Sequence, residues 1–221
     1  MLSVRNLTHD DIEAATDLQS RVYLAIPAFR PDQFHSLLKW FPEGQFVAEL
    51  DGRLVGLAFC LVVLWDDYSL HHSWASVTNE GAFDTHNMDG RTLYGVEVCV
   101  DPDTRGQGVG HALYEARRQL CRAMNLKRVI AGGRLPGYGE HAVHMSPEEY
   151  AKRVIWGDLY DPVLRFQLNE GFDYCDILHG YLPDDSESIG NASLIVWLNP
   201  DYDPERPTLP APANLFEAKT T

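Results

Sequence analysis

The sequence contains no long apolar run. No stretch reaches the roughly 18 consecutive apolar residues of a membrane-spanning helix, and the longest apolar segment, Leu54–Trp65, has the length and character of a strand. The first residues include Asp10, Asp11 and Glu13 and lack the apolar centre of a signal peptide. We therefore expect a cytoplasmic protein with no membrane partner.

Cysteine is scarce, and its spacing does not match the usual redox and zinc motifs. Four cysteines occur, and no two form a Cys-x-x-Cys pair: Cys60, Cys99, Cys121 and Cys175. Three of them lie in apolar segments typical of strands or helices, so reduced, buried thiols are expected rather than a disulfide framework. His141 and His144 could share a helical face, but no cysteine or carboxylate completes a zinc spacing around them, and no metal is expected.

Positive charge is in the minority. The chain has 18 Lys and Arg residues against 32 Asp and Glu residues, a formal net charge of −14. This balance disfavours binding to nucleic acid, whose phosphate backbone requires clustered cations. A negative field would concentrate a cationic amine around the protein. The charge is equally compatible with a simple role in solubility.

Hydrophobic periodicity and turn residues divide the chain into strands and helices. Strands are predicted over Leu2–Leu7, Gln45–Leu50, Arg53–Leu64, Leu93–Val100, Lys127–Ala131, Phe172–Tyr181 and Asn191–Leu198. Helices are predicted from Thr8 to Val22, over Pro31–Trp40 and Gly108–Met124, and after the N-cap residues Ser146 and Asp161. This order indicates one mixed α/β domain built around one sheet, spanning residues 1–199.

Three segments depart from this regular pattern. Residues 65–92 form a long polar insertion, and its four aromatic residues argue against disorder, so a functional loop is expected. A second insertion, residues 132–160, begins with the glycine-rich loop Gly132–Gly139. Residues 200–212 contain five prolines in an acidic context, which indicates that 200–221 is an extended tail.

One segment carries a clear chemical signal. A buried strand ends at Pro102, and Gly106, Gly108 and Gly110 follow at alternate positions where a helix begins. Glycines let a ligand approach the main chain, and successive N–H groups at a helix N-terminus form an anion site that suits a pyrophosphate. The same glycines could simply make a turn. Neither the Gly-x-Gly-x-x-Gly spacing of a dinucleotide site nor the Gly-Lys-Ser/Thr of a Walker loop is present.

Val100–Gly110 resembles the acetyl-CoA signature of the GNAT acetyltransferase superfamily, Val-x-Pro-x-x-Arg-Gly-x-Gly-x-Gly, at every fixed position. The order of predicted elements over residues 2–198 is similar to that superfamily as well. The resemblance implies an α/β (α+β) fold with a mixed, mostly antiparallel sheet, splayed central strands and helices on both faces. It also implies an N-acetyltransferase that takes acetyl-CoA as cosubstrate and acetylates a primary amine.

The resemblance assigns donor-binding roles along this segment. The strand backbone at Val98, Cys99 and Val100 would pair with the pantetheine arm and the acetyl carbonyl, and the backbone of Val98 would polarise the thioester. Arg105 would add charge near the phosphates unless its side chain points to solvent. The main-chain amides that would hold the pyrophosphate belong to Gly106, Gln107, Gly108, Val109, Gly110 and His111.

The predicted general base is Glu97, one residue before the pantetheine-binding positions. A carboxylate inside an apolar strand is costly unless used or paired, so Glu97 is the base, a rim-facing residue or the partner of an arginine. Family members often carry a tyrosine acid in the pattern Leu-Tyr-x-x-x-Gly-Phe, but here Phe166–Phe172 has Gln167 at that position. An amide cannot act as an acid at neutral pH. Tyr160 is the predicted replacement, with Tyr174, water or no acid as alternatives.

The second insertion resembles a subgroup of the superfamily that is often fused to carbon–nitrogen hydrolase domains. The segments that carry this resemblance are Gly132–Tyr138, Thr85-His86, Asp89–Gly95 and Tyr160-Asp161-Pro162, and in this sequence only a short tail follows. GNAT substrates lie just beyond the cofactor strand, where a small-molecule or peptide amine would meet the 65–92 loop and Arg134, Tyr138, Glu140 and His141. The alternative is that Arg134 and Glu140 form a surface ion pair while Tyr138 packs.

Two other functions stay open from the sequence alone. Gln167 in place of tyrosine is compatible with a CoA-binding or regulatory module that does not turn over. The proline-rich tail is compatible with an interaction protein that docks a partner or a second copy of the chain, for example in a homodimer.

Overall fold

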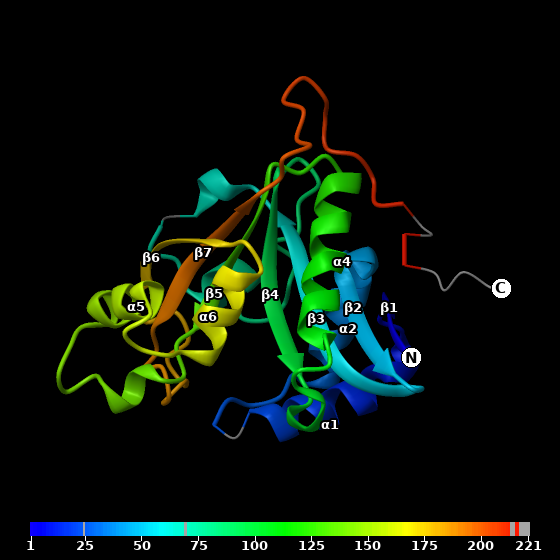
Figure 1. Ribbon diagram of the computed structural model, residues 1–221. Helices are drawn as coiled ribbons and strands as arrows, with labels where there is room; N and C mark the ends of the chain where they lie inside the picture. Colours follow the sequence, from blue (N-terminus) through cyan, green and yellow to red (C-terminus); the bar gives the residue numbers. More distant parts are fainter. Residues whose placement is uncertain (24, 69, 213–214, 217–221) are drawn as a thin grey trace.

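A seven-stranded sheet forms the centre of the computed structural model, which describes residues 1–23, 25–68, 70–212 and 215–216. The strand order is β1-β2-β3-β4-β5-β7-β6, and every neighbouring pair is antiparallel except β4 and β5 (Figure 1). The strands are β1 Leu2–Asn6, β2 Gln45–Leu50, β3 Arg53–Val63, β4 Thr92–Val100, β5 Arg128–Arg134, β6 Asp173–Leu178 and β7 Ala192–Leu198. The predicted mixed, mostly antiparallel sheet is confirmed.

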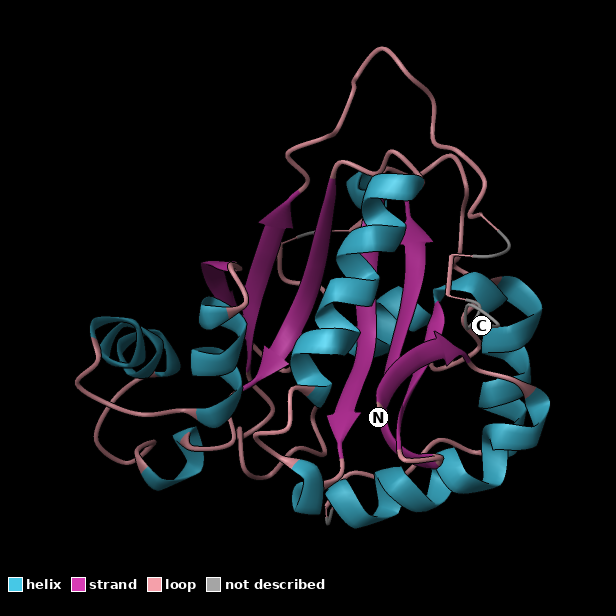
Figure 2. Cartoon of the chain, turned by 45° about the vertical axis from the view of Figure 1, so that its right-hand side comes forward, coloured by secondary structure: helices cyan, strands magenta, loops and turns pink. Residues whose placement is uncertain are grey.

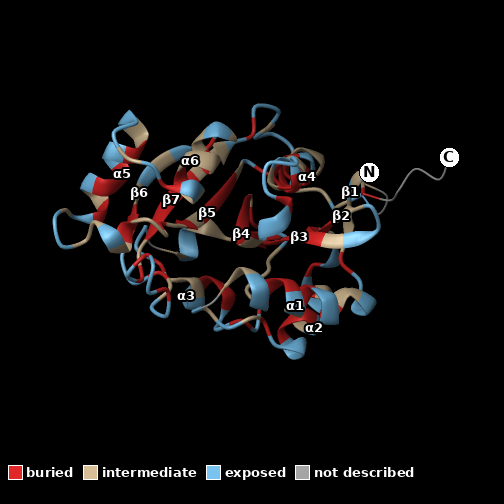
Figure 3. Ribbon diagram, turned by 60° about the horizontal axis from the view of Figure 1, so that its bottom comes forward, coloured by how far each residue is buried: buried red, intermediate tan, exposed pale blue. Residues whose placement is uncertain are grey.

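Helices cover both faces of this sheet, as predicted (Figure 3). One face carries α1 Ile12–Val22, α2 Pro31–Trp40 and α3 Trp74–Thr78, and the other carries α4 Val109–Ala123, α5 Pro147–Trp156 and α6 Pro162–Asn169. Each face has its own cluster of buried apolar side chains, because alternate residues of the central strands point to opposite sides. Within the described residues, no helix is both long enough and apolar enough to cross a bilayer.

The central strands β4 and β5 separate part of the way along the sheet. Their parallel pairing joins Thr92–Gly95 to Arg128–Ala131 and then stops, whereas β4 stays paired with β3 as far as Val100. The register against β3 shifts between Gly95 and Glu97, which leaves Val96 as the extra residue of a β-bulge. We call the space between Val96–Val100 of β4 and Gly132–Arg134 of β5 the β4–β5 opening. It is the splay implied by the resemblance.

Strand β5 is longer than its sequence suggests. The prediction ended the strand at Ala131 and began a glycine-rich loop at Gly132, but pairing with β7 continues through Gly133 to Arg134. Close packing explains the two glycines in a strand. A side chain at Gly132 would overlap the ring of Tyr181, and one at Gly133 would overlap the amide of Gln167.

The proline-rich tail arches above the sheet in Figure 2 and contacts its own chain at several of its described residues. The Asn125 side chain donates to the backbone carbonyls of Asp203 and Arg206, each at 3.0 Å, and the Leu209 N–H donates to the Met124 carbonyl at 2.9 Å. Further along, the Phe216 ring packs against Phe46. Residues 213–214 and 217–221 of the predicted tail lie outside the described residues.

Candidate active site

The glycine turn after β4 leads into a helix whose first amides lack partners within the helix. Gly106 and Gly108 adopt positive φ angles of 78° and 82°, a conformation that favours glycine. Gly108 caps α4 without a side-chain hydrogen bond, and the first turn has no acidic residue. The first amide that closes a helical turn is that of Ala112, which donates to the Gly108 carbonyl. The preceding amides, Val109–His111, have no partner within the helix and stay available for the predicted anion site, whereas the Gln107 N–H donates to the Thr104 carbonyl at 3.3 Å.

Other residues around this turn have structural partners. Gly110 allows close packing, because a Cβ there would lie 2.9 Å from the Phe166 ring. The ring of His111 lies 3.1 Å from the Glu170 carboxylate, and Arg105 is exposed, as the sequence left open. Asp101 fixes the turn by accepting the Asp103 N–H at 3.0 Å.

The open edge of β4 presents alternate backbone groups. The Val96 carbonyl accepts the Trp74 indole N–H at 3.1 Å, and the Val98 carbonyl accepts the Tyr23 hydroxyl at 3.0 Å. Because the N–H and C=O of one residue in an extended strand point to the same side, the Val98 N–H also points away from β3, where it interacts with the Glu97 carboxylate. The intervening Cys99, opposite Leu57, turns its backbone towards β3. This orientation favours Val98 over Cys99 as the residue that would pair with the pantetheine arm.

Glu97 is enclosed beside this edge by residues of α1 and the turn after it. Its carboxylate accepts the Tyr23 hydroxyl at 2.6 Å and the Gln19 amide at 3.3 Å. Burial raises the pKa of the Glu97 carboxyl above its ordinary value, although the hydrogen bond from Tyr23 opposes the shift. Burial also raises the pKa of Tyr23, so its hydroxyl stays protonated. Neither Gln19 nor Tyr23 was predicted, although Gln19 interrupts the apolar face of α1 one turn after Ala15.

Arg134 lies at the end of β5, near the opening, and is paired with two carboxylates. Its guanidinium donates to Asp185 and to Glu187, each at 2.7 Å, and lies 5.4 Å from the centre of the Tyr23 ring. These partners raise the pKa of Arg134 even though burial opposes the change. The sequence offered Glu140 as an alternative ion-pair partner of Arg134. The structure instead pairs Arg134 with Asp185 and Glu187.

The other three predicted acceptor residues belong to the insertion before α5. Tyr138 is buried, donates to the Met145 carbonyl at 3.2 Å and packs 5.6 Å from the ring of Tyr150. The His141 ring lies 5.4 Å from Tyr150, and Glu140 is exposed. No hydrogen bond or ring contact joins these three residues to Glu97 in the described part of the chain. This placement agrees with the alternative that Tyr138 packs inside the protein instead of binding the acceptor.

A second polar cluster lies on the opposite face of the sheet. Gln167 of α6 is 2% exposed, and its amide donates to the Tyr114 hydroxyl at 3.2 Å. Arg117 of α4 is also 2% exposed; it donates to the carbonyls of Phe59 and Glu97, and its guanidinium lies 5.3 Å from the centre of the Tyr114 ring. Sequence reasoning missed Tyr114 and Arg117. The sequence could have pointed to Arg117, because this residue shares a helix face with apolar residues one turn away on either side.

The two tyrosines predicted to replace the acid lie away from the opening. Tyr160 is 71% exposed and directly precedes Asp161, the N-cap of α6. Tyr174 is on β6, and β7 separates that strand from β5. We therefore leave both tyrosines out of the proposed mechanism.

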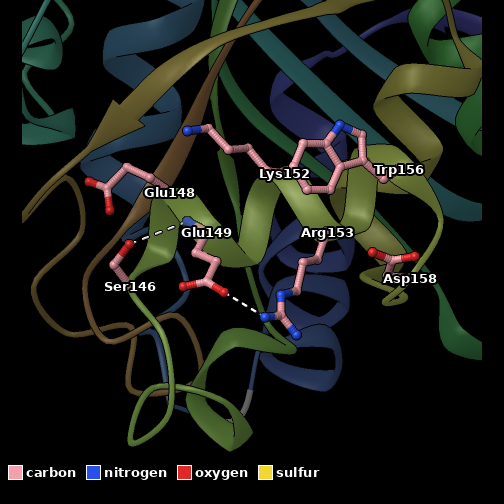
Figure 4. A pocket seen from close by; sticks show the side chains of 7 residues that line it. All are labelled: Ser146, Glu148, Glu149, Lys152, Arg153, Trp156 and Asp158. Carbon is pink, nitrogen blue, oxygen red and sulfur yellow. Dashed lines mark hydrogen bonds and ion pairs between the residues drawn. The ribbon is translucent and has the colours of Figure 1, made fainter.

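A surface pocket on α5 is unrelated to this site. Its lining residues come from α5 and the turns beside it: Ser146, Glu148, Glu149, Lys152, Arg153, Trp156 and Asp158 (Figure 4). Glu149 and Arg153 form an ion pair at 2.6 Å along the helix. No residue of the pocket belongs to β4, β5 or the glycine turn, so the candidate site is the β4–β5 opening.

Two solved structures share the fold over most of their length. The loading GNATL domain of CurA from Lyngbya majuscula superposes with a TM-score of 0.79 at 22% identity, covering 90% of this chain and 98% of that domain. The GphF GNAT-like decarboxylase, in complex with isobutyryl-CoA, gives a TM-score of 0.74 at 22% identity, covering 88% and 98%. At this level of identity the likeness shows the fold alone.

Sequence comparison gives the family. The profile of the "Acetyltransferase (GNAT) family" matches residues 12–145. The probable hydrolase YhcX of Bacillus subtilis is 42% identical over 203 residues, which are 92% of this chain but only 40% of YhcX. The uncharacterized N-acetyltransferase YkwB of the same organism is 35% identical over 207 residues, 91% of this chain and 90% of YkwB. The chain belongs to the GNAT acetyltransferase family.

Proposed function

We propose that this protein transfers an acetyl group from acetyl-CoA to a primary amine. The observation that carries the proposal is the enclosed Glu97 carboxylate on β4, whose neighbour Val98 directs its N–H away from β3 and towards that carboxylate. The same strand leads directly into the uncapped N-terminus of α4. A thioester held along β4 would therefore have its phosphates on one side and a base on the other.

The donor would lie along the β4–β5 opening. The amides of Val109–His111 would hold the pyrophosphate, and Val98 would pair with the end of the pantetheine arm. The Val98 N–H would also donate to the acetyl carbonyl, whose oxygen becomes negative when the amine attacks. A family neighbour that carries isobutyryl-CoA in its solved complex supports a CoA thioester as cosubstrate.

Glu97 would act as the general base. A neutral amine attacks the acetyl carbon, the new C–N bond forms, and the C–S bond to CoA breaks. The amine proton passes to the Glu97 carboxylate, directly or through water. Because burial raises the pKa of this carboxyl, Glu97 is a stronger base than an exposed glutamate and is better matched to an amine near neutral pH.

Acyl-CoA decarboxylation is a second candidate, favoured by the high structural similarity to a GNAT-like decarboxylase. That reaction needs a cation to receive the carboxylate of the acyl group. Arg134 is already paired with Asp185 and Glu187, and the charge of Glu97 would repel a carboxylated acyl group. On the α1 face of the opening these charges favour an uncharged acyl group such as acetyl. Arg117 on the opposite face is a cation outside any direct ion pair with the described residues, so the measurement with malonyl-CoA decides between the two reactions.

The acceptor we propose is a small-molecule or peptide amine that carries positive charge. The net charge of −14 would attract such a substrate, and the carboxylates of Glu97, Asp185 and Glu187 gather near the opening. The free cysteines suit a reducing, cytoplasmic setting.

A module that binds CoA without turnover is the third candidate. It is favoured by Gln167 at the family's tyrosine position and by the surface location of Tyr160. Calorimetry separates it from an enzyme, because such a module would bind CoA while every amine and acyl donor remained unchanged.

Measurement of thiol release tests the three candidates together. Acetyl-CoA and malonyl-CoA would each be incubated with a panel of mono-, di- and polyamines and with short peptides, and the products weighed by mass spectrometry. We expect amine-dependent thiol release with acetyl-CoA, and an acetylated amine. Amine-independent loss of carbon dioxide from malonyl-CoA, with no acetylated product, would overturn the proposal in favour of decarboxylation.

A further inference from the structure

Buried polar atoms without partners gather at one place in the core. Among the described residues, three buried side-chain atoms lack a hydrogen-bond partner: Gln45 Oε1, Arg117 Nε and Gln167 Oε1. Two of the three belong to the cluster of Tyr114, Arg117 and Gln167. Leaving such groups unsatisfied destabilises a fold. Their concentration indicates that this cluster can form hydrogen bonds with a polar group of a bound ligand.

The cluster flanks the β4–β5 opening on the face covered by α4 and α6. Arg117 Nη1 would lie 3.3 Å from a Cβ at Gly95, where pairing between β4 and β5 ends. Gln167 packs against Gly133, on the part of β5 that has separated from β4. A thioester sulfur held in the opening would therefore lie next to these side chains.

Tyr114 is the hydroxyl at the centre of the cluster. It lies 3.2 Å from the Gln167 amide, which donates to it through Nε2 or, with the amide turned over, accepts its proton through Oε1. Its ring is held edge-on by Phe166 and Phe172, with centroids 5.1 and 5.3 Å away. Burial raises the pKa of Tyr114 above its ordinary value, so the hydroxyl remains a donor at physiological pH.

Arg117 adds a buried positive charge that forms no direct ion pair with the described residues, although the Cys60 thiol and the charge of Glu97 act on it. None of the ion pairs among the described residues includes Arg117, whose guanidinium instead contacts two backbone carbonyls and the Tyr114 ring. A buried cation is costly unless a negative charge compensates it. The charge of Glu97 meets part of this need, and a negative charge that forms in the opening during the reaction would meet the rest.

We propose that the Tyr114 hydroxyl donates a hydrogen bond to the sulfur of the leaving CoA thiolate, while Arg117 compensates the negative charge. This arrangement serves in place of the tyrosine that other family members carry at the position of Gln167. When the C–S bond breaks, its electron pair stays on sulfur and the Tyr114 proton is shared with that sulfur. The proton that completes the thiol comes from the amine, by way of Glu97 and water. The proposal rests on the acetyl transfer proposed above.

Tyr23 is less suited to this task than Tyr114. Its hydroxyl lies within hydrogen-bonding distance of both the Glu97 carboxylate and the Val98 carbonyl. Its single proton is therefore already engaged on the opposite face of the sheet.

A leaving-group series tests the proposal by kinetics. Tyr114→Phe removes one oxygen and keeps both ring contacts, and we expect kcat with acetyl-CoA to fall by about 10- to 100-fold. The loss should shrink with acetyl thioesters of CoA analogues whose thiols are more acidic, because their sulfur carries less charge and needs less help. A loss of the same size with every donor would overturn the proposal.

Tyr150→Phe is the matched control. Tyr150 belongs to the same apolar cluster, and its hydroxyl contacts Asp161 rather than the opening. This variant should lose stability. Any loss of kcat that it shows should be the same for every acetyl thioester. If Tyr150→Phe showed the same dependence as Tyr114→Phe, the effect would be structural and the assignment of Tyr114 would fail.

Titration of bound CoA tests the proposal without any acceptor. Free CoA would be bound to the protein, and the thiolate followed by its ultraviolet absorbance across pH. We expect the wild-type protein to lower the pKa of the bound thiol, and both Tyr114→Phe and Arg117→Met to raise it towards the free value, while Arg117→Lys retains most of the effect. An equal thiol pKa in wild type and Tyr114→Phe would overturn the proposal. A protein that lowers the thiol pKa but acetylates no amine would refute the proposed function alone.

Discussion

Two polar clusters flank the β4–β5 opening, and they differ in how fully their partners are supplied. On the face of α1, Glu97 accepts hydrogen bonds from Tyr23 and Gln19, and Arg134 is held by two carboxylates. On the face of α4 and α6, Arg117 has no ion pair among the described residues, and both Arg117 and Gln167 keep a buried atom without a partner. The first cluster is complete in the free protein, and the second is not.

This difference suits two successive tasks. A base must be ready before the amine attacks, so a carboxylate fixed by existing hydrogen bonds is useful. A group that stabilises a thiolate helps only when the charge appears, and catalysis improves when interactions form in the transition state rather than before it. We therefore expect variants in the two clusters to have different kinetic signatures.

The largest expected effect follows loss of the base. Glu97→Gln should lower kcat by on the order of 10²- to 10⁴-fold. It should also remove the rise in activity with pH that follows deprotonation of Glu97 above its raised pKa. The measurement is the pH profile of acetyl transfer, with Glu49→Gln as the control, because Glu49 is a paired carboxylate on β2 outside the opening. Full activity of Glu97→Gln at every pH would remove Glu97 as the base.

A smaller effect is expected in the donor loop. Gly106 and Gly52 form a matched pair: their φ angles are 78° and 77°, and neither has an atom within 4 Å of an added Cβ. Each change to alanine should cost about 1 kcal/mol of stability, because both force alanine into the left-handed region. Only Gly106→Ala should weaken CoA binding, by roughly 10-fold, since its methyl group would face the pyrophosphate. Equal CoA affinity in the two variants, measured by calorimetry, would contradict the assigned phosphate site.

Stability should respond to pH in a direction set by Glu97. Its pKa is higher in the folded protein than in the unfolded chain, so the folded state holds the extra proton and stability falls as pH rises through this range. Glu97→Gln carries no such charge and should be more stable than wild type at pH 7, by on the order of 1 kcal/mol. The gain should vanish in acid. Thermal melting at several pH values measures this, and a variant less stable than wild type at pH 7 would contradict the burial of a charged Glu97.

The smallest expected effect lies at the rim of the first cluster. Glu187→Gln removes one of the two carboxylates that hold Arg134 and keeps the other, Asp185. Because Glu187 is exposed, its charge is screened by solvent. We expect KM for a cationic amine to rise about two- to threefold at low salt and KM for acetyl-CoA to stay constant. An unchanged KM for the amine at low salt would place the acceptor elsewhere.

The donor half of the site could be predicted from local sequence, because its parts are consecutive. A strand, a proline and three glycines before a helix fix the backbone of residues 98–111 by local geometry alone. The order of elements along the chain followed from periodicity and turn residues, and the mostly antiparallel sheet with helices on both faces followed from the family resemblance. Within this segment, the alternation along β4 turns the backbone of Cys99 towards β3, and the Gln107 N–H donates to the Thr104 carbonyl.

The rest depended on contacts between distant segments. Gly132 and Gly133 predicted a loop, and they are strand residues because Tyr181 and Gln167 occupy the space of their side chains. In the sequence, Tyr114 and Arg117 look like ordinary helix residues. Only the packing of α4 beneath the opening places them beside the candidate site. Tyr160 was predicted as one of several possible acids, beside Tyr174 and water, and its exposure depends on where the insertion folds. Local patterns cannot supply such long-range information.

The most direct test compares the two clusters in a single experiment. Rates of acetyl transfer by wild type, Glu97→Gln and Tyr114→Phe would be measured across pH with a series of acetyl thioesters. The account predicts that Glu97→Gln changes the pH profile and leaves the dependence on the thiol unchanged, whereas Tyr114→Phe steepens that dependence and leaves the pH profile unchanged. Identical changes in both variants would contradict the division of labour between the two faces of the opening.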